Sequence, residues 1–450
     1  MTDYTKKTFF RLGKLLHFAV TILLFFVCCK HSIIKSSSLH LETLVFIYAA
    51  TMLFAFRSYS AYNVGSFRIP MLVYSQCLAN IIGAGLVYTL LVINQLSFLN
   101  PVPLLLLVLT QFIWNTIWNT VCNTLYFRVY QPKNTILIYR NSVDRSRLLE
   151  LFEHKRKFNV VKEIENPADD IHALIDELSD IDAVFVAGIN ATLRNGILKH
   201  CVEENIRCYI MPHVGDVIMM GAKQVDLFSV PVFRVMRAEA NIEYLIIKRS
   251  IDIICSLLGI IVLSPFMLLT AAAVKLYDGG PCLYKQIRLT QNGRKFEILK
   301  LRSMSVNAEK DGVARLASTN DSRITPVGKV IRACRLDELP QLFNILRGDM
   351  SIVGPRPERP EIAKQYEETM PAFSLRLQVK AGLTGFAQVY GKYNTDPYDK
   401  LRMDLMYINQ MSFLQDIKLI FATVKVLFMK ESTSGIAEGQ TTAAIPVERK

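Results

Sequence analysis

The chain has 450 residues, of which 51% are hydrophobic, and its mean hydropathy is +0.26. This composition excludes a disordered or collagen-like polymer and is too apolar for an ordinary soluble protein. Lys and Arg number 52 against 39 Asp and Glu, which gives a formal net charge of +13. The charge favours an anionic membrane surface or phosphorylated ligands. Nucleic acid is a poor candidate partner, because the basic residues are spread among apolar runs instead of forming a stripe.

Nine cysteines are scattered along the chain without a C-x-x-C pair. They predict neither a zinc site nor a disulfide framework. A reducing, cytoplasmic location for the soluble parts follows from this.

Four apolar stretches predict four transmembrane helices in an N-terminal domain, 1–130. They cover 15–29, 41–56, 71–96 and 103–127. A span needs about 20 residues, so the first two must borrow from their flanks. The positive-inside rule puts both ends of the domain in the cytoplasm, although Lys30 and Lys35 in the first outer loop depart from it. The first stretch is expected to stay as an anchor, because no small-residue cleavage site follows it.

Residues 131–240 alternate short apolar runs with amphipathic stretches and predict a Rossmann-like α/β domain with a parallel sheet. The expected strands are 135–139, 160–163, 183–187 and 207–210, and the expected helices are 145–155, 171–178 and 193–203. The first strand-to-helix turn, 140–144, has no glycine where a backbone would approach a pyrophosphate. Dinucleotide binding is therefore not expected. Four histidines in this region lack partners at metal-binding spacing and are interpreted as surface or packing residues: His154, His172, His200 and His213.

A fifth apolar segment, 251–276, contains Ser264 and Pro265 near its middle. Its length predicts a span, but proline removes a backbone hydrogen bond and predicts a kink. A complete crossing would carry the following basic region to the opposite side of the membrane. Two interpretations stay open: a re-entrant helix that breaks at Ser264 and Pro265, and a kinked but complete span.

After Gly280 the sequence is rich in cations that surround paired acidic residues. No histidine follows His213, so a catalytic centre here would depend on carboxylates, hydroxyls, thiols or a metal. Arginines around carboxylates suit phosphoryl transfer, in which guanidinium groups hold phosphate oxygens and a carboxylate binds a divalent ion or attacks phosphorus.

Asp337 and Glu338 also allow a purely structural interpretation. They precede a predicted helix, 339–346, with Pro340 in its first turn, where the helix dipole favours acidic residues whatever their function. Adjacent carboxylates diverge on a helix, which disfavours the opposed pair of a glycosidase. Cys334 has no histidine to activate it and is interpreted as a small packing residue. The segment 354–357 predicts a rigid loop that presents one arginine.

The string from Arg332 to Pro357, R-A-C-R-L-D-E-L-P-Q-L-F-N-I-L-R-G-D-M-S-I-V-G-P-R-P, is similar to the signature of the bacterial sugar transferase family, the polyprenyl-phosphate hexose-1-phosphate transferases. The resemblance covers about 248–430. Its further parts are Lys248, Arg249 and Asp252, Ser264-Pro265, Gly280-Pro281, Gln286 and Arg288, Lys300 to Met304, Gly382 to Gly385, Gln388, Gly391, and Asp404 to Asp416. Leu301 and Ala381 depart from the usual pattern, and neither touches the expected chemistry.

This resemblance implies a mainly helical catalytic domain, 246–430, that includes a re-entrant membrane helix. It would transfer hexose 1-phosphate from a UDP-hexose to undecaprenyl phosphate, release UMP and begin exopolysaccharide, capsule or O-antigen assembly. By resemblance, Asp337 is the nucleophile of a covalent phosphosugar intermediate and Glu338 holds Mg²⁺. The candidate phosphate binders are Lys300, Arg302, Arg332, Arg356 and Arg359. The expected location is the bacterial inner membrane, with the catalytic domain on the cytoplasmic face.

Larger members of the family carry a similar N-terminal region, for which assembly or regulation, including a homodimer, is the expected role. The segment 416–429 predicts an interfacial helix with Lys418 and Lys425 opposite its apolar face, and 431–450 predicts a disordered tail. Two alternatives stay open: the same reaction with a UDP-N-acetylhexosamine donor, and a membrane-anchored metabolite sensor or scaffold.

Overall fold

The computed structural model describes residues 3–30, 40–152, 157–168, 171, 174, 176–178, 180–227, 230–238, 240–306, 308, 321–391 and 395–427. The expected tail, 431–450, and two of the four histidines, His154 and His172, lie outside these residues. Contacts divide the chain into two compact units, Met1–Met211 and Pro212–Lys450.

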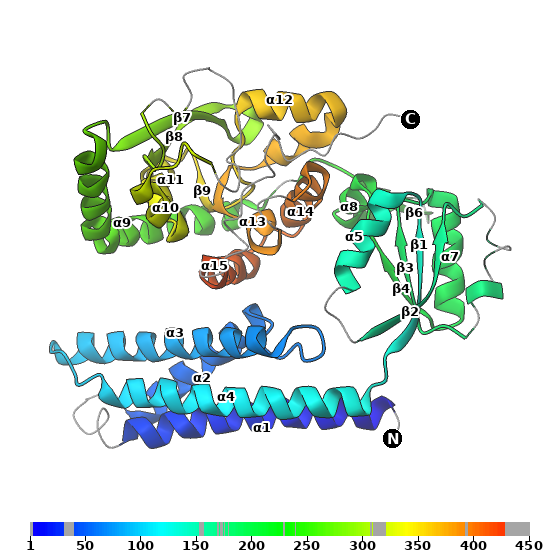
Figure 1. The fold of residues 1–450 in the computed structure, drawn as a ribbon, viewed down its shortest axis with the longest axis horizontal. Helices are drawn as coiled ribbons and strands as arrows, with labels where there is room; N and C mark the ends of the chain where they lie inside the picture. The colour runs from blue at the N-terminus through cyan, green and yellow to red at the C-terminus, as the bar shows by residue number, and fades with distance from the viewer. Residues whose placement is uncertain are drawn as a thin grey trace. The chain divides into compact units, whose positions relative to one another are not determined.

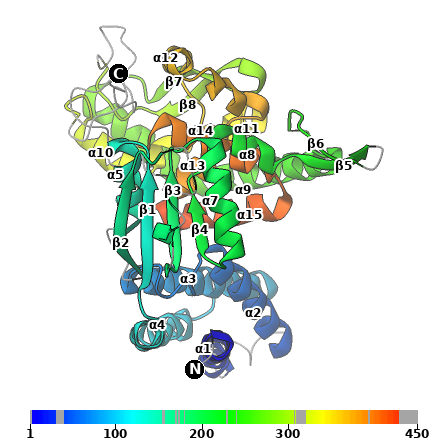
Figure 2. The same cartoon turned by 90° about the vertical axis from the view of Figure 1, so that its right-hand side faces the viewer.

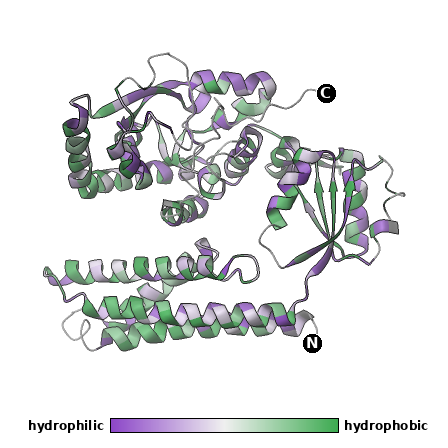
Figure 3. Ribbon diagram, in the orientation of Figure 1, coloured by the Kyte–Doolittle hydropathy of each residue, from purple (hydrophilic) through white to green (hydrophobic). Residues whose placement is uncertain are grey.

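The first unit begins with four long helices, as the hydropathy predicts. They are α1 (Asp3–Lys30), α2 (Leu41–Ser58), α3 (Ile69–Gln95) and α4 (Val102–Val129), and each is long and apolar enough to cross a membrane. Apolar residues cover most of these helices (Figure 3). Polar side chains are instead buried between them: His17 Nε2 lies 3.1 Å from Asn115 Oδ1, and Gln111 Nε2 donates to Thr21 O at 3.1 Å. Inward-facing polar groups of this kind are typical of membrane bundles.

A four-stranded parallel sheet follows. Its strands are β1 (Lys133–Tyr139), β2 (Phe158–Glu165), β3 (Ala183–Ala187) and β4 (Arg207–Ile210), in the order β2-β1-β3-β4 (Figure 2). Helices α5 (Ser142–Phe152) and α7 (Ala191–Glu203) supply the crossovers. The parallel α/β pattern that the sequence predicts is present. Within the expected helix at 171–178, the described residues include Leu174, which is helical, and a short 3₁₀ turn, Asp176–Leu178.

The carboxyl ends of β1 and β3 mark the point where the strand order reverses, which is the usual ligand site of such sheets. Gly188 follows β3 with φ +70°, and a Cβ added there would collide with the Asp144 carboxylate. Asp144 lies in the first turn of α5. A carboxylate therefore stands near the helix N-terminus where a pyrophosphate would otherwise bind.

The second unit is mainly helical and contains short pairs of strands (Figure 1). Its order is α8 (Val214–Met220), β5 (Lys223–Leu227), β6 (Val230–Arg234), α9 (Ile242–Asp278), β7 (Leu283–Leu289), η2 (Gln291–Gly293), β8 (Lys295–Leu301), α10 (Pro326–Ala333), η3 (Leu336–Glu338), α11 (Gln341–Arg347), β9 (Ser351–Val353), α12 (Pro360–Thr369), η4 (Pro371–Gln378), β10 (Gly382–Thr384), α13 (Phe386–Tyr390), α14 (Pro397–Asn409) and α15 (Phe413–Leu427). β7 and β8 pair antiparallel, whereas β9 and β10 pair in parallel.

The contacts assign residues 212–240 to this second unit, a different boundary from the expected domain 131–240. Helix α8 packs against α14, where Val217 is fully buried in a core with Leu401 and Leu405. Asn409 Nδ2 donates to Val217 O at 2.5 Å. Short apolar runs in the sequence cannot show which core a helix joins, so the boundary at 240 was wrong.

Helix α9 bends at its proline, as expected. Pro265 lies inside the helix, and Figure 1 shows two legs that run in different directions. Proline has no N–H for the carbonyl four residues earlier, Ile261. The Ser264 hydroxyl donates to that carbonyl at 2.9 Å. The Ser-Pro pair therefore breaks the backbone ladder and supplies the missing hydrogen bond.

Helix α15 overlaps the expected interfacial segment, 416–429, but does not expose it. The exposed Leu414 precedes that segment, residues 416–426 are all buried or half-buried, and Lys425 is only 9% exposed. Lys425 was expected opposite the apolar face and is instead buried, which lowers its pKa to about 8.

Candidate active site

The paired carboxylates lie on η3, a short turn between α10 and α11. The preceding residue, Arg335, has a left-handed backbone with φ 53° and ψ 23°. A non-glycine residue in this region costs of order 1–3 kcal/mol and is held only by its surroundings. The turn joins the two helices and contacts β8, so Asp337 and Glu338 stand at their junction and next to β8.

Glu338 is surrounded by three cations from different parts of the chain. Its Oε1 accepts from Lys300 Nζ at 3.1 Å and from Arg356 Nη2 at 2.8 Å, and its Oε2 lies 3.5 Å from Arg335 Nη1. Burial works to raise the pKa of Glu338, but the charges of Arg356, Lys300 and Arg335 outweigh it and hold the pKa well below its usual range. Glu338 is therefore ionised at neutral pH.

Asp337 has a different environment although it is the adjacent residue. Its side chain is buried, and among the described residues it makes no hydrogen bond or ion pair. Burial, followed by the charge of Glu338, raises the pKa of Asp337 to about 6, against the lowering effect of Lys300, Arg332 and Arg356. The carboxylate is mostly ionised at pH 7, and its oxygens are uncommitted. These are the properties of a nucleophile or a ligand.

The expected phosphate binders divide into two groups. Lys300 and Arg356 contact Glu338 directly, and Arg332 acts on Asp337 through its charge. Arg302 instead pairs with Asp278 in the last turn of α9, and Arg359 lies 3.7 Å from Glu361 at the start of α12. The sequence analysis did not predict Arg335 as a site residue, although it contacts Glu338. Its position two residues before Asp337, within the family signature, was the signal that could have identified it.

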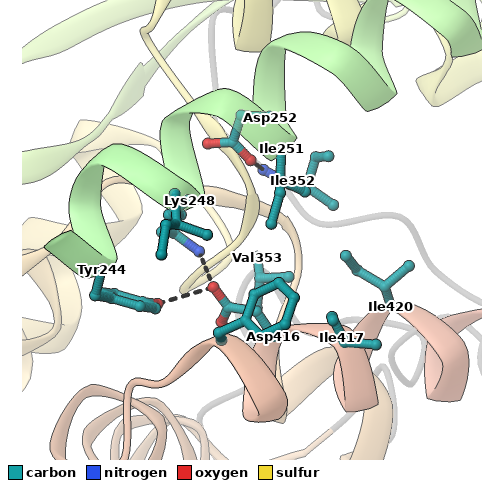
Figure 4. Close-up of a pocket in the computed structure, with 11 residues that line it drawn as sticks. Tyr244, Lys248, Ile251, Asp252, Ile352, Val353, Asp416, Ile417 and Ile420 are labelled. Atoms are coloured by element: carbon teal, nitrogen blue, oxygen red, sulfur yellow. Dashed lines mark hydrogen bonds and ion pairs between the residues drawn. The ribbon is translucent and has the colours of Figure 1, made fainter.

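The K-R-x-x-D opening fastens α9 to the rest of the unit (Figure 4). Lys248 Nζ lies 2.6 Å from Asp416 Oδ2 in α15, and Tyr244 donates to the same oxygen at 2.8 Å. Asp252 accepts from the Ile352 backbone N–H at 2.9 Å. Arg249 donates to the carbonyls of Ile345 and Leu346, both at 2.7 Å, and so supplies hydrogen bonds to carbonyl groups at the C-terminal end of α11. These motif residues therefore hold helices in place and do not line the carboxylate site.

Magnesium fits the carboxylate pair by donor chemistry. The described residues hold no cluster of three or more His, Cys, Asp or Glu side chains that could bind a metal ion. Mg²⁺, however, commonly uses one or two protein carboxylates and takes its other oxygens from water and substrate phosphates. Asp337 offers uncommitted oxygens, whereas a bound ion at Glu338 would share that carboxylate with its cations.

Comparison with known proteins points to one family. The model of the family described as bacterial sugar transferase matches residues 243–430. A relative from Caulobacter vibrioides, named UDP-glucose:undecaprenyl-phosphate glucose-1-phosphate transferase, is 40% identical over 190 residues, which cover 41% of this chain and 71% of the relative. The chain belongs to the bacterial sugar transferase family. This confirms the resemblance drawn from the Arg332–Pro357 signature.

Two other sugar transferases align over longer stretches. A UDP-N-acetylgalactosamine-undecaprenyl-phosphate N-acetylgalactosaminephosphotransferase from Aeromonas hydrophila is 42% identical over 259 residues, 55% of this chain and 60% of the relative. A UDP-glucose:undecaprenyl-phosphate glucose-1-phosphate transferase from Klebsiella pneumoniae is 35% identical over 291 residues, 62% of each chain. The chain thus spans somewhat less than two thirds of the length of these two relatives.

Proposed function

We propose that this sugar transferase moves a hexose 1-phosphate from a UDP-sugar to undecaprenyl phosphate, releases UMP, and so begins the assembly of a polysaccharide repeat. The names of its relatives support the donor and acceptor classes. The observation that carries the chemistry is Asp337, a buried carboxylate without a partner among the described residues and surrounded by cations.

In the proposed first step, an Asp337 oxygen attacks the sugar-side phosphorus of the donor. A new carboxyl oxygen to phosphorus bond forms, the bond to the bridging oxygen breaks, and UMP leaves. In the second step, a phosphate oxygen of the lipid attacks the same phosphorus and the Asp337 carboxylate is restored. Covalent catalysis of this kind divides one difficult transfer into two displacements.

The cations around Glu338 would bind the charged donor. Arg356 is the best placed of them, because its side chain is partly exposed while it contacts Glu338. Guanidinium groups match phosphate oxygens in two-point contacts. Asp337 and Glu338 are the residues that would hold Mg²⁺, which supplies further neutralisation of phosphate charge.

Helix α9 is proposed to enter the membrane and leave on the same face. The bend at Pro265 and the exposed apolar side chains on both sides of it, including Ile261, Phe266 and Leu269, support this path. The site would then meet the lipid phosphate at the cytoplasmic surface of the bacterial inner membrane, where UDP-sugars are available.

Relatives with two kinds of donor leave two candidate sugars. Relatives from Klebsiella pneumoniae and Caulobacter vibrioides carry UDP-glucose in their names, and the 42% identical relative carries UDP-N-acetylgalactosamine. We propose a UDP-hexose as the donor, with the N-acetylhexosamine as the second candidate. A panel of labelled donors, each incubated with enzyme and lipid, identifies the sugar by the rate of UMP release.

A rapid-quench experiment tests the two-step route. Wild-type protein is mixed with radiolabelled UDP-sugar and no lipid, quenched, and digested. We expect up to one equivalent of UMP and label on the peptide that contains Asp337. Asp337→Asn should give neither. The matched control is Asp349→Asn, since Asp349 pairs with Arg294 and makes no contact with Glu338.

Absence of label from wild-type protein that turns over with lipid would overturn the covalent intermediate. Absence of UMP with every donor, with and without lipid, would overturn the transferase activity and favour the sensor or scaffold alternative.

A further inference from the structure

The loop that carries Arg356, Gly354–Glu358, is held by hydrogen bonds from other segments and by ion pairs of Glu358 with Arg288 and Arg376. Pro355 and Pro357 have no N–H, so the loop cannot form a regular turn ladder of its own. Each residue has an outside partner: Gly354 N donates to Thr384 O at 2.8 Å, Gly382 N to Pro355 O at 2.8 Å, Arg376 Nη2 to Arg356 O at 2.9 Å, Arg288 Nη1 to Pro357 O at 3.2 Å, and Leu289 N to Glu358 O at 3.0 Å.

The donor to the Arg356 backbone carbonyl, Arg376, belongs to a buried ion pair. Arg376, in η4, is 3% exposed, and Asp404, in α14, is 1% exposed. Arg376 Nε lies 2.9 Å and Nη2 2.7 Å from Asp404 Oδ2, while the guanidinium stands 4.9 Å from the centre of the Phe373 ring. Asp404 and Phe373 together fix the plane of the guanidinium, and hence the direction in which Nη2 donates to Arg356 O.

Stability alone does not account for this pair. Removing two charges from water costs about as much as their attraction returns, so buried ion pairs contribute little net stability compared with apolar residues of similar size. What an ion pair supplies is direction. Here the directed group reaches the backbone of the arginine whose side chain contacts Glu338 at 2.8 Å.

We infer that Arg376 and Asp404 are positioning residues that fix the Arg356 backbone and thereby aim its guanidinium at the phosphates of the donor, an inference that rests on the proposed transferase function. Arg376 is too deeply buried to touch a substrate, so its effect must pass through the loop. A displacement of about 1 Å in a positioned group can lower a rate by about a hundredfold.

The test is a double-mutant cycle on the full-length protein, with the rate of Asp337 labelling and of UMP release as readouts. The single variants are Arg376→Met, Asp404→Asn and Arg356→Ala, and each of the first two is also combined with Arg356→Ala. We expect Arg376→Met to lower kcat by roughly 10- to 100-fold with a change in KM of less than about threefold. In the Arg356→Ala background the same change should cost less than about threefold, because coupled residues are not additive.

Arg402→Met is the matched control. Arg402 is another buried arginine, which donates to Pro212 O from α14 and pairs with Asp399 of its own helix. It should lower the thermal unfolding midpoint without lowering kcat. If Arg376→Met fails to fold, Arg376→Lys replaces it. Lysine keeps the positive charge but cannot donate to Asp404 and to Arg356 O from one planar group, so it should still lower kcat.

A full, multiplicative loss from Arg376→Met in the Arg356→Ala background would overturn the inference, because Arg376 would then act independently of Arg356. A normal kcat in both Arg376 variants would also overturn it. Either result leaves the transferase proposal standing as long as wild-type protein releases UMP, whereas an inactive wild type overturns the proposed function itself.

Discussion

Two adjacent carboxylates in this protein have opposite electrostatic environments. Glu338 is held by Lys300, Arg335 and Arg356, so its charge is stabilised in the folded state. Asp337 is buried without a partner among the described residues, so its charge is destabilised. One carboxylate therefore organises the cations, and the other keeps the uncommitted oxygens that the proposed nucleophile requires; such a division is common in pairs of catalytic acids.

The pKa of Asp337 predicts how activity depends on pH. A nucleophilic carboxylate must be ionised, and burial raises this pKa to about 6. We expect the rate of single-turnover labelling to be constant above pH 7 and to fall roughly tenfold for each pH unit well below 6. A rate that stays flat down to pH 5, measured with the protein still folded, would contradict the raised pKa.

The same contrast predicts opposite effects of two amide substitutions on stability. The pKa of Asp337 is higher in the folded protein, about 6, than the ordinary aspartate value of 3.8. The folded state therefore binds the proton more tightly, and the stability that this gives below pH 4 is lost as pH rises through 6. Asp337→Asn removes the buried charge and should stabilise the protein by roughly 1–3 kcal/mol at pH 7.5. That gain should shrink as pH falls from 6 to 4.

Glu338→Gln should do the reverse, because it leaves three cations without an anionic partner. We expect a loss on the order of 3 kcal/mol at pH 7.5. Thermal or denaturant unfolding of both variants in the same detergent measures whether each substitution raises or lowers the free energy of unfolding. Equal destabilisation by both substitutions would show that Asp337 is stabilised by a partner, contrary to the structure.

At the scale of single elements, α9 combines a proline break with a replaced hydrogen bond. The kink was predictable because proline acts locally, whatever surrounds it. The fixing of the helix base was not, since Lys248 and Asp416 are 168 residues apart. The bend and the fixed base together suit a helix that returns to its side of entry.

The re-entrant path proposed for α9 predicts the result of a topology experiment. Reporter tags placed after Leu276 and after Arg128 should both report the cytoplasm, because a re-entrant helix does not transfer the following domain across the membrane. A periplasmic report from the first tag, with a cytoplasmic report from the second, would show that α9 spans completely.

At the scale of the whole molecule, an N-terminal unit with four membrane-type helices and a parallel sheet precedes a sugar transferase unit. The sheet has the topology of a nucleotide-binding domain, but its first strand-to-helix turn, 140–144, contains no glycine. Asp144 lies against Gly188 at the reversal point of the strand order, and a carboxylate there repels a phosphate. The fold alone thus does not imply a cofactor.

This occupied reversal point predicts that the sheet domain does not bind dinucleotides. Isothermal calorimetry with the full-length protein should detect no micromolar binding of NAD or FAD. Asp144→Gly serves as a comparison, since it removes the carboxylate and opens the turn. Micromolar binding by the wild-type protein would contradict the prediction and give this domain a cofactor role instead of one in assembly.

Local sequence patterns were enough to predict the features that depend on neighbouring residues. Hydropathy gave the four N-terminal helices, alternating patterns gave the parallel sheet, proline gave the kink, and the signature around Asp337 gave the family. Each of these signals lies within one continuous stretch, so no knowledge of the tertiary structure was needed to interpret it.

Which cations contact which carboxylate could be learned only from the fold. Lys300 and Arg356 reach Glu338 across 38 and 18 residues, and Arg376 meets Asp404 across 28. Arg302 is a cation that could bind phosphate as well as Lys300 could. It lies two residues further along the chain, just beyond the end of β8, and pairs with Asp278 instead of Glu338. Composition can show that arginines and carboxylates are abundant, but their pairing depends on packing between distant segments, which determines how far each charge is removed from water.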